Sequence, residues 1–470
     1  MLNPSFCDQI KELVGSSNVY TDSVSLLSYS YDATPNYQSM PQIIVEPGNT
    51  EEVSGIVKLC SEYEIPIVPR GSGTNLCAGT IPVDGGLVML FNRMAGILEM
   101  DEENLTATVQ PGVITQTLIE EAERKSLFYP PDPGSMKIST IGGNINECSG
   151  GLRGMKYGVT KDYVLGLTAV LPNGDIVKTG GKLTKDVAGY DLTKLLIGSE
   201  GTLAIVTEAI LKLVPKPESK KTMLALFENI ENAAQTVSDI IAARIIPATL
   251  EFLDQGTLQA VEDFAQIGLP TNVEAVLLIE QDGSPDAVVS DIRKIEALCR
   301  ENGAFSVEVA STDQEAAQLM TARRAALTAL SRLKPTTILE DATVPRSKVA
   351  EMVRFVNETA RKFNLQICTF GHAGDGNLHP TCLTDARDME ELERVEQAFE
   401  EIFAKAVDLG GTITGEHGVG MMKAPYLSWK IGEEGVNIMK SIKAAFDPKN
   451  ILNPGKMFGK STRKRVVIRS

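Results

Sequence analysis

The sequence predicts an α+β protein built from two or three domains. Its 470 residues are too many for one hydrophobic core. Pro215, Lys216 and Pro217 form a hinge rich in helix and strand breakers directly after an apolar strand, and we place a domain boundary there. Beyond the hinge, helical patterns alternate with short apolar strands, which is typical of helices packed on one side of an antiparallel sheet.

Charge and cysteine usage narrow the function classes. The formal net charge is −16, so nucleic acid and anionic membranes are poor partners, and an anionic substrate would need a locally positive pocket. No apolar run reaches the length of a membrane span, and the N-terminus lacks a basic-then-apolar signal pattern. The seven cysteines never form a Cys-x-x-Cys spacing. We therefore expect reduced thiols, a cytoplasmic location and no iron–sulfur cluster held by this chain alone.

The first domain begins with a strand, a helix and a second strand that ends in a glycine-rich loop. Residues 43–45 are an apolar run, and Asn49 followed by Glu52 has the spacing of a capping box at a helix start. The second strand, 65–68, leads into the loop 69–79. Glycine admits positive φ and close approach, so consecutive backbone N–H groups of the loop can turn toward a phosphate or pyrophosphate. The loop matches neither a Walker motif nor the Rossmann fingerprint, and a plain surface turn is the alternative.

Further glycine-rich stretches favour an extended ligand. Residues 130–135 form a proline-rich turn, and residues 139–151 are long and glycine-dense enough to wrap a flat molecule. Residues 162–171 predict a strand, which a hairpin turn joins to a second strand at 176–179. The run 197–208 ends one helix and starts another strand.

Two glycine-bracketed segments hold all three histidines of the chain. His372 and His379 lie together in one segment, and His417 lies in 415–418. A helix would separate the first pair by roughly 10 Å along its axis, and a straight strand would place them on opposite faces. Because residues 374–377 have strong turn chemistry, we expect two strands joined by a tight loop, with both rings side by side. The alternative is two unrelated imidazoles that flank a glycine turn.

The order of these motifs resembles a known superfamily. Four segments resemble the PCMH-type FAD-binding domain of the vanillyl-alcohol-oxidase and cresol-methylhydroxylase superfamily, namely 70–76, 130–135, 139–151 and 198–208. The string Gly-His-Ala-Gly-Asp-Gly-Asn-Leu-His at 371–379, with the second histidine motif, is similar to the FAD-dependent 2-hydroxyacid dehydrogenases. Glycolate oxidase FAD subunits and D-lactate dehydrogenases belong to that branch. The resemblance extends from about Ser30 to about Gly459.

The resemblance implies a non-covalent FAD in the first domain. The residues that it assigns to the cofactor are Arg70, Gly71, Ser72, Gly73, Thr74, Asn75, Pro133, Gly134, Ser135, Ser139, Thr140, Gly142, Gly143, Asn144, Gly150, Gly151, Glu200, Gly201, Ile205 and Asn453. Some members of the superfamily tether FAD through a histidine in the first loop. This chain has Thr74 and Asn75 there and no histidine before His372, so we expect no tether at that position.

The resemblance also implies a substrate site in the second domain. Arg324 and Thr328 are four residues apart in a helical pattern, 321–328, and would bind the substrate carboxylate from one helix face, with Asn377 nearby. Without the resemblance, Arg323 and Arg324 would be interpreted as solvated surface charges on the helix. Relatives that use dicarboxylates carry a basic residue soon afterwards, whereas residues 338–341 of this chain are Ile-Leu-Glu-Asp, which favours a monocarboxylate.

The two histidine motifs predict a metal site and a catalytic base. A short strand, 412–414, leads to Glu416 and His417. Adjacent residues of an extended chain point to opposite sides, so we expect Glu416 to join His372 and His379 around a divalent zinc, manganese or iron ion. Such a set leaves positions open for a substrate. His417 would then face the flavin and accept a proton.

Four ranges describe the predicted domain organisation. We expect an N-terminal helical segment at 1–37, the FAD-binding domain at 38–217, a substrate and metal domain at 218–424, and a C-terminal segment at 425–470 that returns to close over the flavin. In the second domain we expect helices at 230–243, 285–302, 349–363 and 389–409 and strands at 275–280 and 306–309. The last ten residues are basic and expected to be solvated.

The predicted reaction is the FAD- and metal-dependent oxidation of a small 2-hydroxy monocarboxylate, glycolate or D-lactate, to the 2-oxo acid. A non-catalytic flavoprotein subunit that relays electrons is the alternative, and it would not need the histidine motifs. An ether-lipid synthase of the same superfamily, which uses FAD without net redox chemistry, would not explain the metal ligands.

We also predict a separate electron acceptor. The sequence has no cluster motif and no haem-attachment motif, so we expect an iron–sulfur subunit or an electron-transferring flavoprotein to receive the electrons. Any membrane association would then occur through such partners. The alternative is direct transfer to a small soluble carrier or to oxygen.

Overall fold

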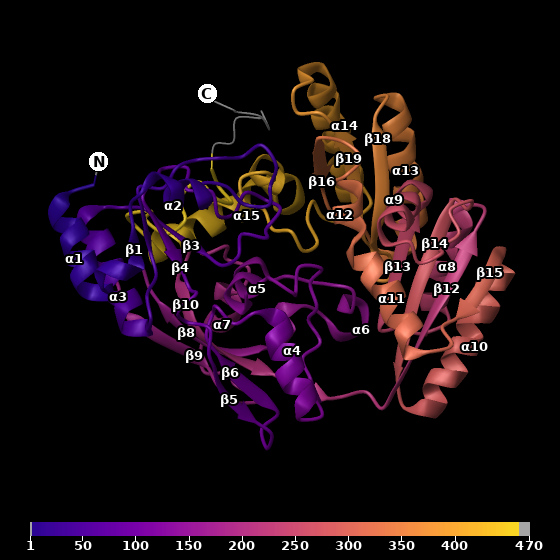
Figure 1. Cartoon of the computed structure of the whole chain (residues 1–470), viewed down its shortest axis with the longest axis horizontal. Helices are drawn as coiled ribbons and strands as arrows, with labels where there is room; N and C mark the ends of the chain where they lie inside the picture. The colour runs from indigo at the N-terminus through magenta and orange to yellow at the C-terminus, as the bar shows by residue number, and fades with distance from the viewer. Residues whose placement is uncertain (1, 460–470) are drawn as a thin grey trace. The chain divides into compact units, whose positions relative to one another are not determined.

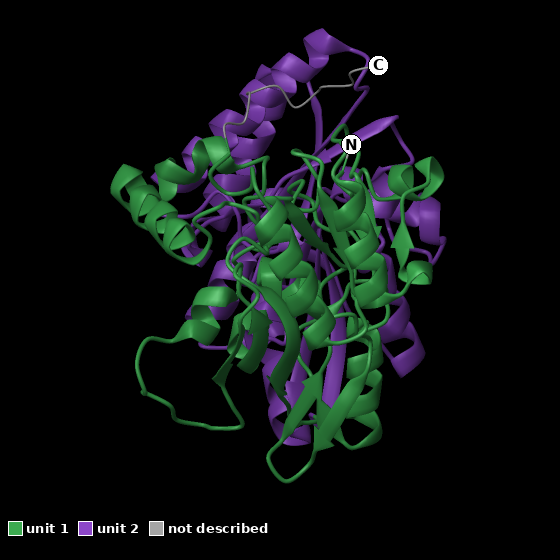
Figure 2. Ribbon diagram, turned by 90° about the vertical axis from the view of Figure 1, so that its left-hand side faces the viewer, with its two compact units in different colours: residues 1–149, 159–216, 416–470 green, residues 150–158, 217–415 purple. Residues whose placement is uncertain are grey.

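The chain passes repeatedly between two units. The computed structural model describes residues 2–459, and the predicted basic tail lies outside them. Unit 1 combines residues 1–149, 159–216 and 416–470, and unit 2 combines residues 150–158 and 217–415 (Figures 1 and 2). None of the helices within residues 2–459 combines the length and the apolar character that a membrane crossing requires.

Unit 1 opens with a small mixed sheet. Its order is β1, β2, β4, β3, with the bounds Val19–Tyr20, Ile43–Val45, Leu87–Leu90 and Ile67–Arg70. Strands β2 and β3 both run parallel to β4, and α3 (Thr50–Tyr63) connects β2 to β3. The predicted helix start is confirmed, because Asn49 Oδ1 accepts a hydrogen bond from the Glu52 backbone N–H at 2.8 Å. Strand β3 ends at Arg70, the first residue of the predicted phosphate loop.

A second, antiparallel sheet completes the core of unit 1. Its order is β5, β6, β10, β8, β9, with the bounds Ile97–Asp101, Thr106–Val109, Ile205–Lys212, Val164–Val170 and Ile176–Gly180. The predicted hairpin is confirmed, since Val170 pairs with Ile176. Strands β7 (Leu127–Phe128) and β11 (Val214–Pro215) pair separately. The helices of unit 1 besides α3 are α1 (Pro4–Val14), α2 (Ser23–Ser28), α4 (Thr115–Arg124), α5 (Ile141–Glu147), α7 (Leu192–Leu196) and α15 (Leu427–Phe446).

The C-terminal segment returns to the first sheet, as the sequence predicted. After α15 the chain lies beside β3, where the Ile67 backbone N–H donates to the Ile451 carbonyl at 2.7 Å. The Asn453 N–H donates in turn to the Ile67 carbonyl at 2.7 Å. Main-chain hydrogen bonds therefore fix Asn453 next to the strand that carries Arg70.

Unit 2 is built on one large antiparallel sheet (Figure 1). Its strands in order are β15 (Ala304–Val309), β12 (Ser219–Phe227), β14 (Ala275–Gly283), β13 (Thr249–Asp254), β18 (Gln366–His372), β19 (Asn377–Thr384) and β16 (Thr336–Leu339), with β17 (Ala342–Thr343) also paired to β19. The helices are α6 (Gly154–Tyr157), α8 (Ile230–Ala242), α9 (Gln255–Ala265), α10 (Pro285–Glu301), α11 (Asp313–Arg324), α12 (Ala326–Leu330), α13 (Val349–Lys362) and α14 (Met389–Asp408). The α+β class with an antiparallel second sheet is confirmed.

Helices cover both faces of this sheet rather than one. Leu278 on β14 packs with Leu258 of α9 and Met320 of α11. Side chains alternate between faces along a strand, and Leu277, on the opposite face from Leu278, is also fully buried. Helices α8 and α10 pack against β12 and β14 without contributing to the first cluster. The register places Glu251 of β13 opposite Leu278, on the face that α9 and α11 cover.

Candidate active site

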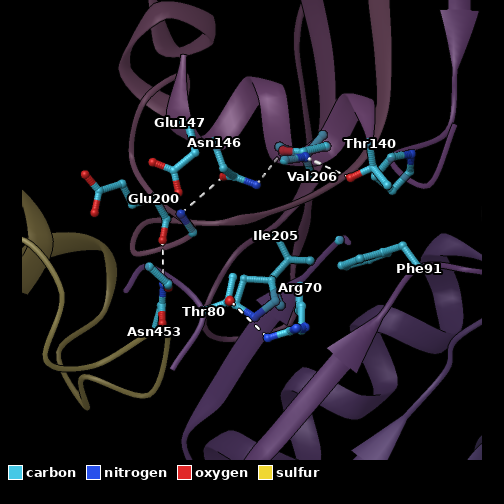
Figure 3. Close-up of a pocket in the computed structure, with 17 residues that line it drawn as sticks. Arg70, Thr80, Phe91, Thr140, Asn146, Glu147, Glu200, Ile205, Val206 and Asn453 are labelled. Atoms are coloured by element: carbon cyan, nitrogen blue, oxygen red, sulfur yellow. Dashed lines mark hydrogen bonds between the residues drawn. The ribbon is translucent and has the colours of Figure 1, made fainter. Parts of the chain in front are cut away.

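Unit 1 contains a hollow beside the end of β3 that opens to solvent (Figure 3). The lining residues are Pro69, Arg70, Gly71, Gly79, Thr80, Phe91, Pro111, Thr140, Gly142, Gly143, Asn146, Glu147, Glu200, Gly201, Ile205, Val206 and Asn453. Parts of three segments that the sequence assigned to FAD, at 70–71, 140–143 and 200–205, therefore line one cavity together with Asn453.

Two glycines of this cavity are required by packing. A Cβ on Gly142 would lie 2.6 Å from Pro111 Cβ, so only glycine fits the first turn of α5 at this place. Gly201 has φ +68°, and its Cβ would lie 2.6 Å from Pro69 Cγ. Both positions keep the cavity wall as bare backbone, which allows a ligand to approach main-chain N–H groups closely.

The side chain of Arg70 braces the loop. Its Nη1 donates to the Tyr31 carbonyl at 2.7 Å and to Thr80 Oγ1 at 3.1 Å, and its guanidinium lies 5.5 Å from the centre of the Tyr29 ring. Burial lowers the pKa of Arg70. Asn75 is also used internally, because its Oδ1 accepts the Gly79 N–H at 2.8 Å. These two predicted cofactor residues therefore shape the loop through their side chains.

Two buried polar atoms at the cavity wall fit a polar ligand. Arg70 Nε and Asn453 Oδ1 have no hydrogen-bond partner within the part of the chain that the structure describes. The Nδ2 of Asn453 is fully used, since it donates to the Gly79 carbonyl at 2.9 Å and to the Glu200 carbonyl at 2.7 Å. Buried polar atoms are normally satisfied, so these two atoms indicate that a ligand supplies their partners. The chemistry of the cavity therefore fits FAD.

The run 139–151 does not wrap a ligand as an extended segment. Its middle forms α5, which Thr140 caps. Residues three or four apart share a helix face, so Gly142, Gly143 and Asn146 point toward the cavity together. Asn144 lies on another face, where its Nδ2 donates to Thr115 Oγ1 at 2.7 Å.

Eleven of the predicted cofactor residues do not line this cavity, and their roles stay predictions. They are Ser72, Gly73, Thr74, Asn75, Pro133, Gly134, Ser135, Ser139, Asn144, Gly150 and Gly151. Two of them, Gly150 and Gly151, begin the short segment that packs with unit 2. Sequence reasoning missed Thr80, Phe91, Asn146 and Glu147, although a helical interpretation of 139–151 would have pointed to the last two.

Glu200 connects the cavity to the loop that carries His417. Its carboxylate accepts the Val419 N–H at 2.6 Å and the Gly420 N–H at 2.7 Å. Burial raises the pKa of Glu200, and burial together with the charge of Glu200 raises the pKa of Glu147. The residues after His417 are therefore held from within unit 1.

The predicted histidine hairpin is present in unit 2. Strands β18 and β19 pair so that Phe370 faces His379 and His372 faces Asn377. The tight turn uses Gly376 at φ +86°. The rings of His372 and His379 lie on the same face, with their centres 5.1 Å apart and their planes perpendicular. The register of the hairpin, rather than their spacing alone, brings the two imidazoles together.

The segment before Glu416 is not the short strand that we expected. Only Thr412 forms a bridge, to Thr343, and the chain then bends. Asp341 holds the bend, because its Oδ2 accepts the Gly415 N–H at 2.6 Å. Glu416, the carboxylate of the predicted donor set, is the next residue, so the bend that Asp341 holds in unit 2 leads directly to it.

The donor set fits a divalent ion. Two imidazole nitrogens and one carboxylate oxygen are ligands that zinc, manganese and iron accept. His372 and His379 are only 6% and 3% exposed, which keeps competing water away from the ligands.

The prediction that Glu416 and His417 point to opposite sides is wrong. His417 Nε2 lies 4.0 Å from Glu416 Oε1. The reason is the bend at 415–417, followed by Gly418 at φ +85°, which replaces the extended backbone on which the prediction relied. The imidazole of His417 is therefore close to the carboxylate of the donor set.

Sequence reasoning also missed a buried ion pair behind the histidines. Arg323 was interpreted as a surface charge, but its side chain is 5% exposed and forms a salt bridge with the fully buried Glu251. Glu251 Oε1 lies 2.7 Å from His372 Nδ1. Burial raises the pKa of Glu251, but the charges of Arg323 and His372 outweigh burial and leave that pKa below its ordinary value.

The predicted substrate residues occupy three elements. The helix expected over 321–328 is divided at Ala325, so Arg324 ends α11 and is partly buried, whereas Thr328 lies in α12 and is exposed. Asn377 begins β19 and is buried, with its Oδ1 accepting from Thr343 Oγ1 at 3.0 Å. The assignment of these three residues to a substrate stays a prediction.

Comparisons with known proteins identify the family. Residues 216–457 match the C-terminal domain of the FAD linked oxidases, and residues 41–180 match an FAD binding domain. The chain is 68% identical over 467 residues to the glycolate oxidase subunit GlcD of Bacillus subtilis (strain 168), covering 99% of each chain. It is 36% identical over 467 residues to the D-lactate dehydrogenase of Anaerostipes hadrus, covering 97% of this chain and 98% of that relative.

A solved structure of p-cresol methylhydroxylase shares the fold, with a TM-score of 0.81 at 18% identity over 97% of this chain and 96% of that chain. The chain therefore belongs to the FAD-linked oxidase family. Within that family it is an enzyme of the FAD-dependent 2-hydroxyacid dehydrogenase type, as the two histidine motifs predicted.

Proposed function

We propose that this enzyme oxidises a small 2-hydroxy monocarboxylate, glycolate or D-lactate, to the corresponding 2-oxo acid. The relatives named as a glycolate oxidase subunit and as a D-lactate dehydrogenase support this substrate class. We further propose that FAD is bound without a covalent tether and that His372, His379 and Glu416 hold a divalent ion. Acid precipitation should then release all flavin into the supernatant.

The observation that carries the proposal is the arrangement around Glu416. The imidazoles of His372 and His379 lie with their ring centres 5.1 Å apart, and His417 Nε2 lies 4.0 Å from a carboxylate oxygen of Glu416, the third predicted ligand. A flavoprotein that only relays electrons would need the cavity of unit 1 but no donor set beside an imidazole. The same argument disfavours an enzyme that uses FAD without net redox chemistry.

The proposed roles follow from the chemistry of each group. Bound FAD would supply the hydride acceptor, and a divalent ion held by His372, His379 and Glu416 would supply a Lewis acid for the hydroxyl group of the substrate. His417 accepts the hydroxyl proton at Nε2 as a general base. Arg324 and Thr328 bind the substrate carboxylate, for which a planar guanidinium is suited, and Asn377 orients the substrate beside the hairpin.

The acidic residues directly after β16, which pairs with β19, support a substrate with one carboxylate. Glu340 and Asp341 follow β16 and are 1% and 0% exposed. The Glu340 N–H donates to the Pro380 carbonyl at 3.1 Å, directly after His379. This segment therefore offers a second carboxylate of a substrate no basic partner, because the two residues after β16 are acidic.

The proposed electron acceptor is a separate iron–sulfur subunit or electron-transferring flavoprotein. All seven cysteines are free thiols. Burial raises the pKa of Cys60, Cys299 and Cys368, so these three are poor thiolate ligands for a cluster. The relative from Bacillus subtilis carries the word subunit in its name, which supports a partner. We propose a cytoplasmic enzyme whose membrane association, where it occurs, is through that partner.

Anaerobic flavin bleaching tests the substrate class. Purified enzyme is mixed with glycolate, D-lactate, L-lactate and a 2-hydroxy dicarboxylate, and the loss of flavin absorbance is followed. We expect rapid bleaching with glycolate or D-lactate and slow bleaching with the dicarboxylate. Bleaching by none of these acids in metal-loaded enzyme would favour the relay subunit instead.

Steady-state turnover of the isolated chain tests the acceptor. With substrate present, we expect negligible oxygen consumption and fast turnover once an artificial dye accepts the electrons. Oxygen consumption as fast as anaerobic flavin reduction would show that the chain needs no partner.

A further inference from the structure

Glu251 is a carboxylate buried at the centre of unit 2. It lies on β13, and its side chain is 0% exposed. Carboxylates are rarely buried fully unless a charge or a ligand requires them there. The register pairs Phe252 with Gly371, so Glu251 lies on the neighbouring strand to β18, close to His372.

The contact between Glu251 and His372 fixes the tautomer of the imidazole. Glu251 Oε1 lies 2.7 Å from His372 Nδ1. An ionised carboxylate can only accept hydrogen bonds, so Nδ1 carries a proton, and in the neutral imidazole Nε2 then presents its lone pair. That lone pair is the one a metal ion needs from a neutral imidazole.

Arg323 completes the support from the other side. It forms a salt bridge with Glu251, and its guanidinium lies 4.9 Å from the centre of the Phe370 ring. The Phe370 ring is in turn 5.3 Å from the ring of His379. The buried ion pair of Glu251 and Arg323 therefore contacts His372 directly. It reaches His379 only through the Phe370 ring, which lies between Arg323 and His379.

We propose that Glu251, held in place by Arg323, is a positioning residue that orients His372 for metal binding. The inference rests on the proposed donor set of His372, His379 and Glu416. Outer carboxylates that accept from a ligating imidazole commonly change metal affinity by about 10- to 100-fold. A purely structural ion pair would change stability and leave metal affinity unaltered.

Metal titration of chelator-treated, flavin-loaded protein is the primary test. Zn²⁺ and Mn²⁺ are added separately, and Kd is measured by competition with a metal indicator dye. We expect E251Q to raise Kd by about 10- to 100-fold while the flavin spectrum stays unchanged. The matched control is E280Q, because Glu280 is 4% exposed on the adjacent strand β14 and accepts from Thr222 Oγ1 at 3.2 Å. E280Q should leave Kd unaltered.

A second variant covers the case in which E251Q folds poorly, since it would leave Arg323 buried without its counter-charge. The double variant E251M/R323M replaces the whole ion pair with apolar side chains of similar size, which buried ion pairs often tolerate. It should bind Zn²⁺ as weakly as E251Q does.

Histidine ¹⁵N spectra of the metal-free protein supply a readout that stability does not affect. The chain has only three histidines, so the side-chain spectrum is simple. In wild type, one ring should be fixed as the Nδ1-protonated tautomer. In E251M/R323M, that ring alone should change to a mixture of tautomers.

The outcomes separate this inference from the proposed metal site. If wild type binds Zn²⁺ and Mn²⁺ but both variants bind them equally well, the positioning role is wrong and the donor set stands. If wild type binds neither ion, both the donor set and the positioning role are wrong. Weaker binding by both variants, with an unchanged E280Q control, supports the inference.

Discussion

The FAD cavity of unit 1 and the histidine hairpin of unit 2 are built in opposite ways. The cavity wall is largely backbone, and glycines such as Gly142 and Gly201 keep it bare. The hairpin site is made of charged and polar side chains that project from one face of a sheet, with Glu251 and Arg323 buried behind them. The first site requires that side-chain atoms be absent at certain positions, whereas the second requires particular side chains to be present.

This difference predicts opposite sensitivities to mutation. A backbone site should tolerate the loss of many single side chains but fail when one Cβ is added. A side-chain site should fail when one ligand is removed. The predictions below test this contrast, beginning with the largest expected effect.

Removing one ligand of the hairpin site should abolish turnover. In H372A, we expect the rate of dye-coupled substrate oxidation to fall by more than about 100-fold, because a catalytic ion contributes several kcal/mol. The flavin spectrum should stay intact, since the cavity lies in unit 1. Chelator treatment of wild type should reproduce both results. Full activity of a metal-free, chelator-treated sample would contradict the assignment of the site.

Adding atoms to the cavity wall should abolish flavin binding instead. In G142V, the new side chain would overlap Pro111, whose carbonyl oxygen already lies 3.1 Å from an ideal Cβ. Overpacking of this kind costs about 1 to 3 kcal/mol and shifts the backbone of α5. We expect colourless protein with a lowered Tm.

The paired control for G142V removes a side chain from the same helix face. N146A deletes the amide that accepts the Gly201 N–H at 3.2 Å, and it should retain most of its flavin. Full flavin content in G142V together with flavin loss in N146A would reverse the contrast between the two sites.

Two buried carboxylates beside the hairpin show how a cation changes the electrostatics of such a site. Glu251 has Arg323 next to it, and its pKa is lowered. Asp254 accepts N–H groups from Thr257 at 2.8 Å and Thr369 at 2.5 Å, but burial outweighs these bonds and raises its pKa to about 6. Asp254 therefore titrates within an accessible pH range.

The raised pKa gives a pH dependence of stability with a defined sign. Between about pH 4 and pH 6 the folded state binds more protons at Asp254 than the unfolded state, so its contribution to the free energy of unfolding falls as pH rises. The total change is at most about 3 kcal/mol. Urea unfolding of wild type and D254N is measured at several pH values. The free energy of unfolding of wild type, taken relative to that of D254N, should decrease from pH 4 to pH 6. A constant difference would contradict the raised pKa.

The hairpin site was more predictable from sequence than the cavity, and the reason is physical. Histidine is rare in this chain, and turn chemistry between two strands leaves one arrangement that brings His372 and His379 together. The sequence could not reveal Glu251 or Arg323, because their contact with the hairpin depends on the register of β13 against β18. Arg323 was taken for a surface charge because a helical pattern alone does not say which side faces the sheet.

The cavity was predicted as a set of loops and only in part as a set of residues. Glycine density pointed to segments that line the cavity, such as 70–71 and 142–143, but it does not distinguish an extended wrap from the short helix α5. The same limitation misplaced the backbone near Glu416, where a bend held by Asp341 replaces the expected strand. The cap that Thr140 supplies begins the helix in the first case, and a hydrogen bond to Asp341, distant in sequence, fixes the bend in the second.

The smallest expected effect concerns Gly134, which the family resemblance assigns to the flavin but which does not line the cavity described here. A Cβ built on Gly134 meets no atom within 4 Å among the described residues, so G134A should leave the Tm unchanged. If the turn at 130–135 lies against the flavin ring, the added methyl group will crowd the ring and weaken FAD binding by about 10-fold, or roughly 1.4 kcal/mol.

The matched control for G134A is G181A in the same unit, where the nearest atom to an ideal Cβ is Leu183 Cγ at 4.0 Å. The affinity of each apoprotein for FAD is measured by flavin fluorescence quenching. G181A should bind like wild type, because its methyl group points into open space away from the assigned loops. If G134A binds FAD with wild-type affinity, the turn at 130–135 is not part of the flavin site. The part of that site built from backbone would then be the cavity beside β3 alone. Weaker FAD binding in G134A alone would show that an added methyl group harms the flavin site even at Gly134, where it contacts no other atom of the described residues.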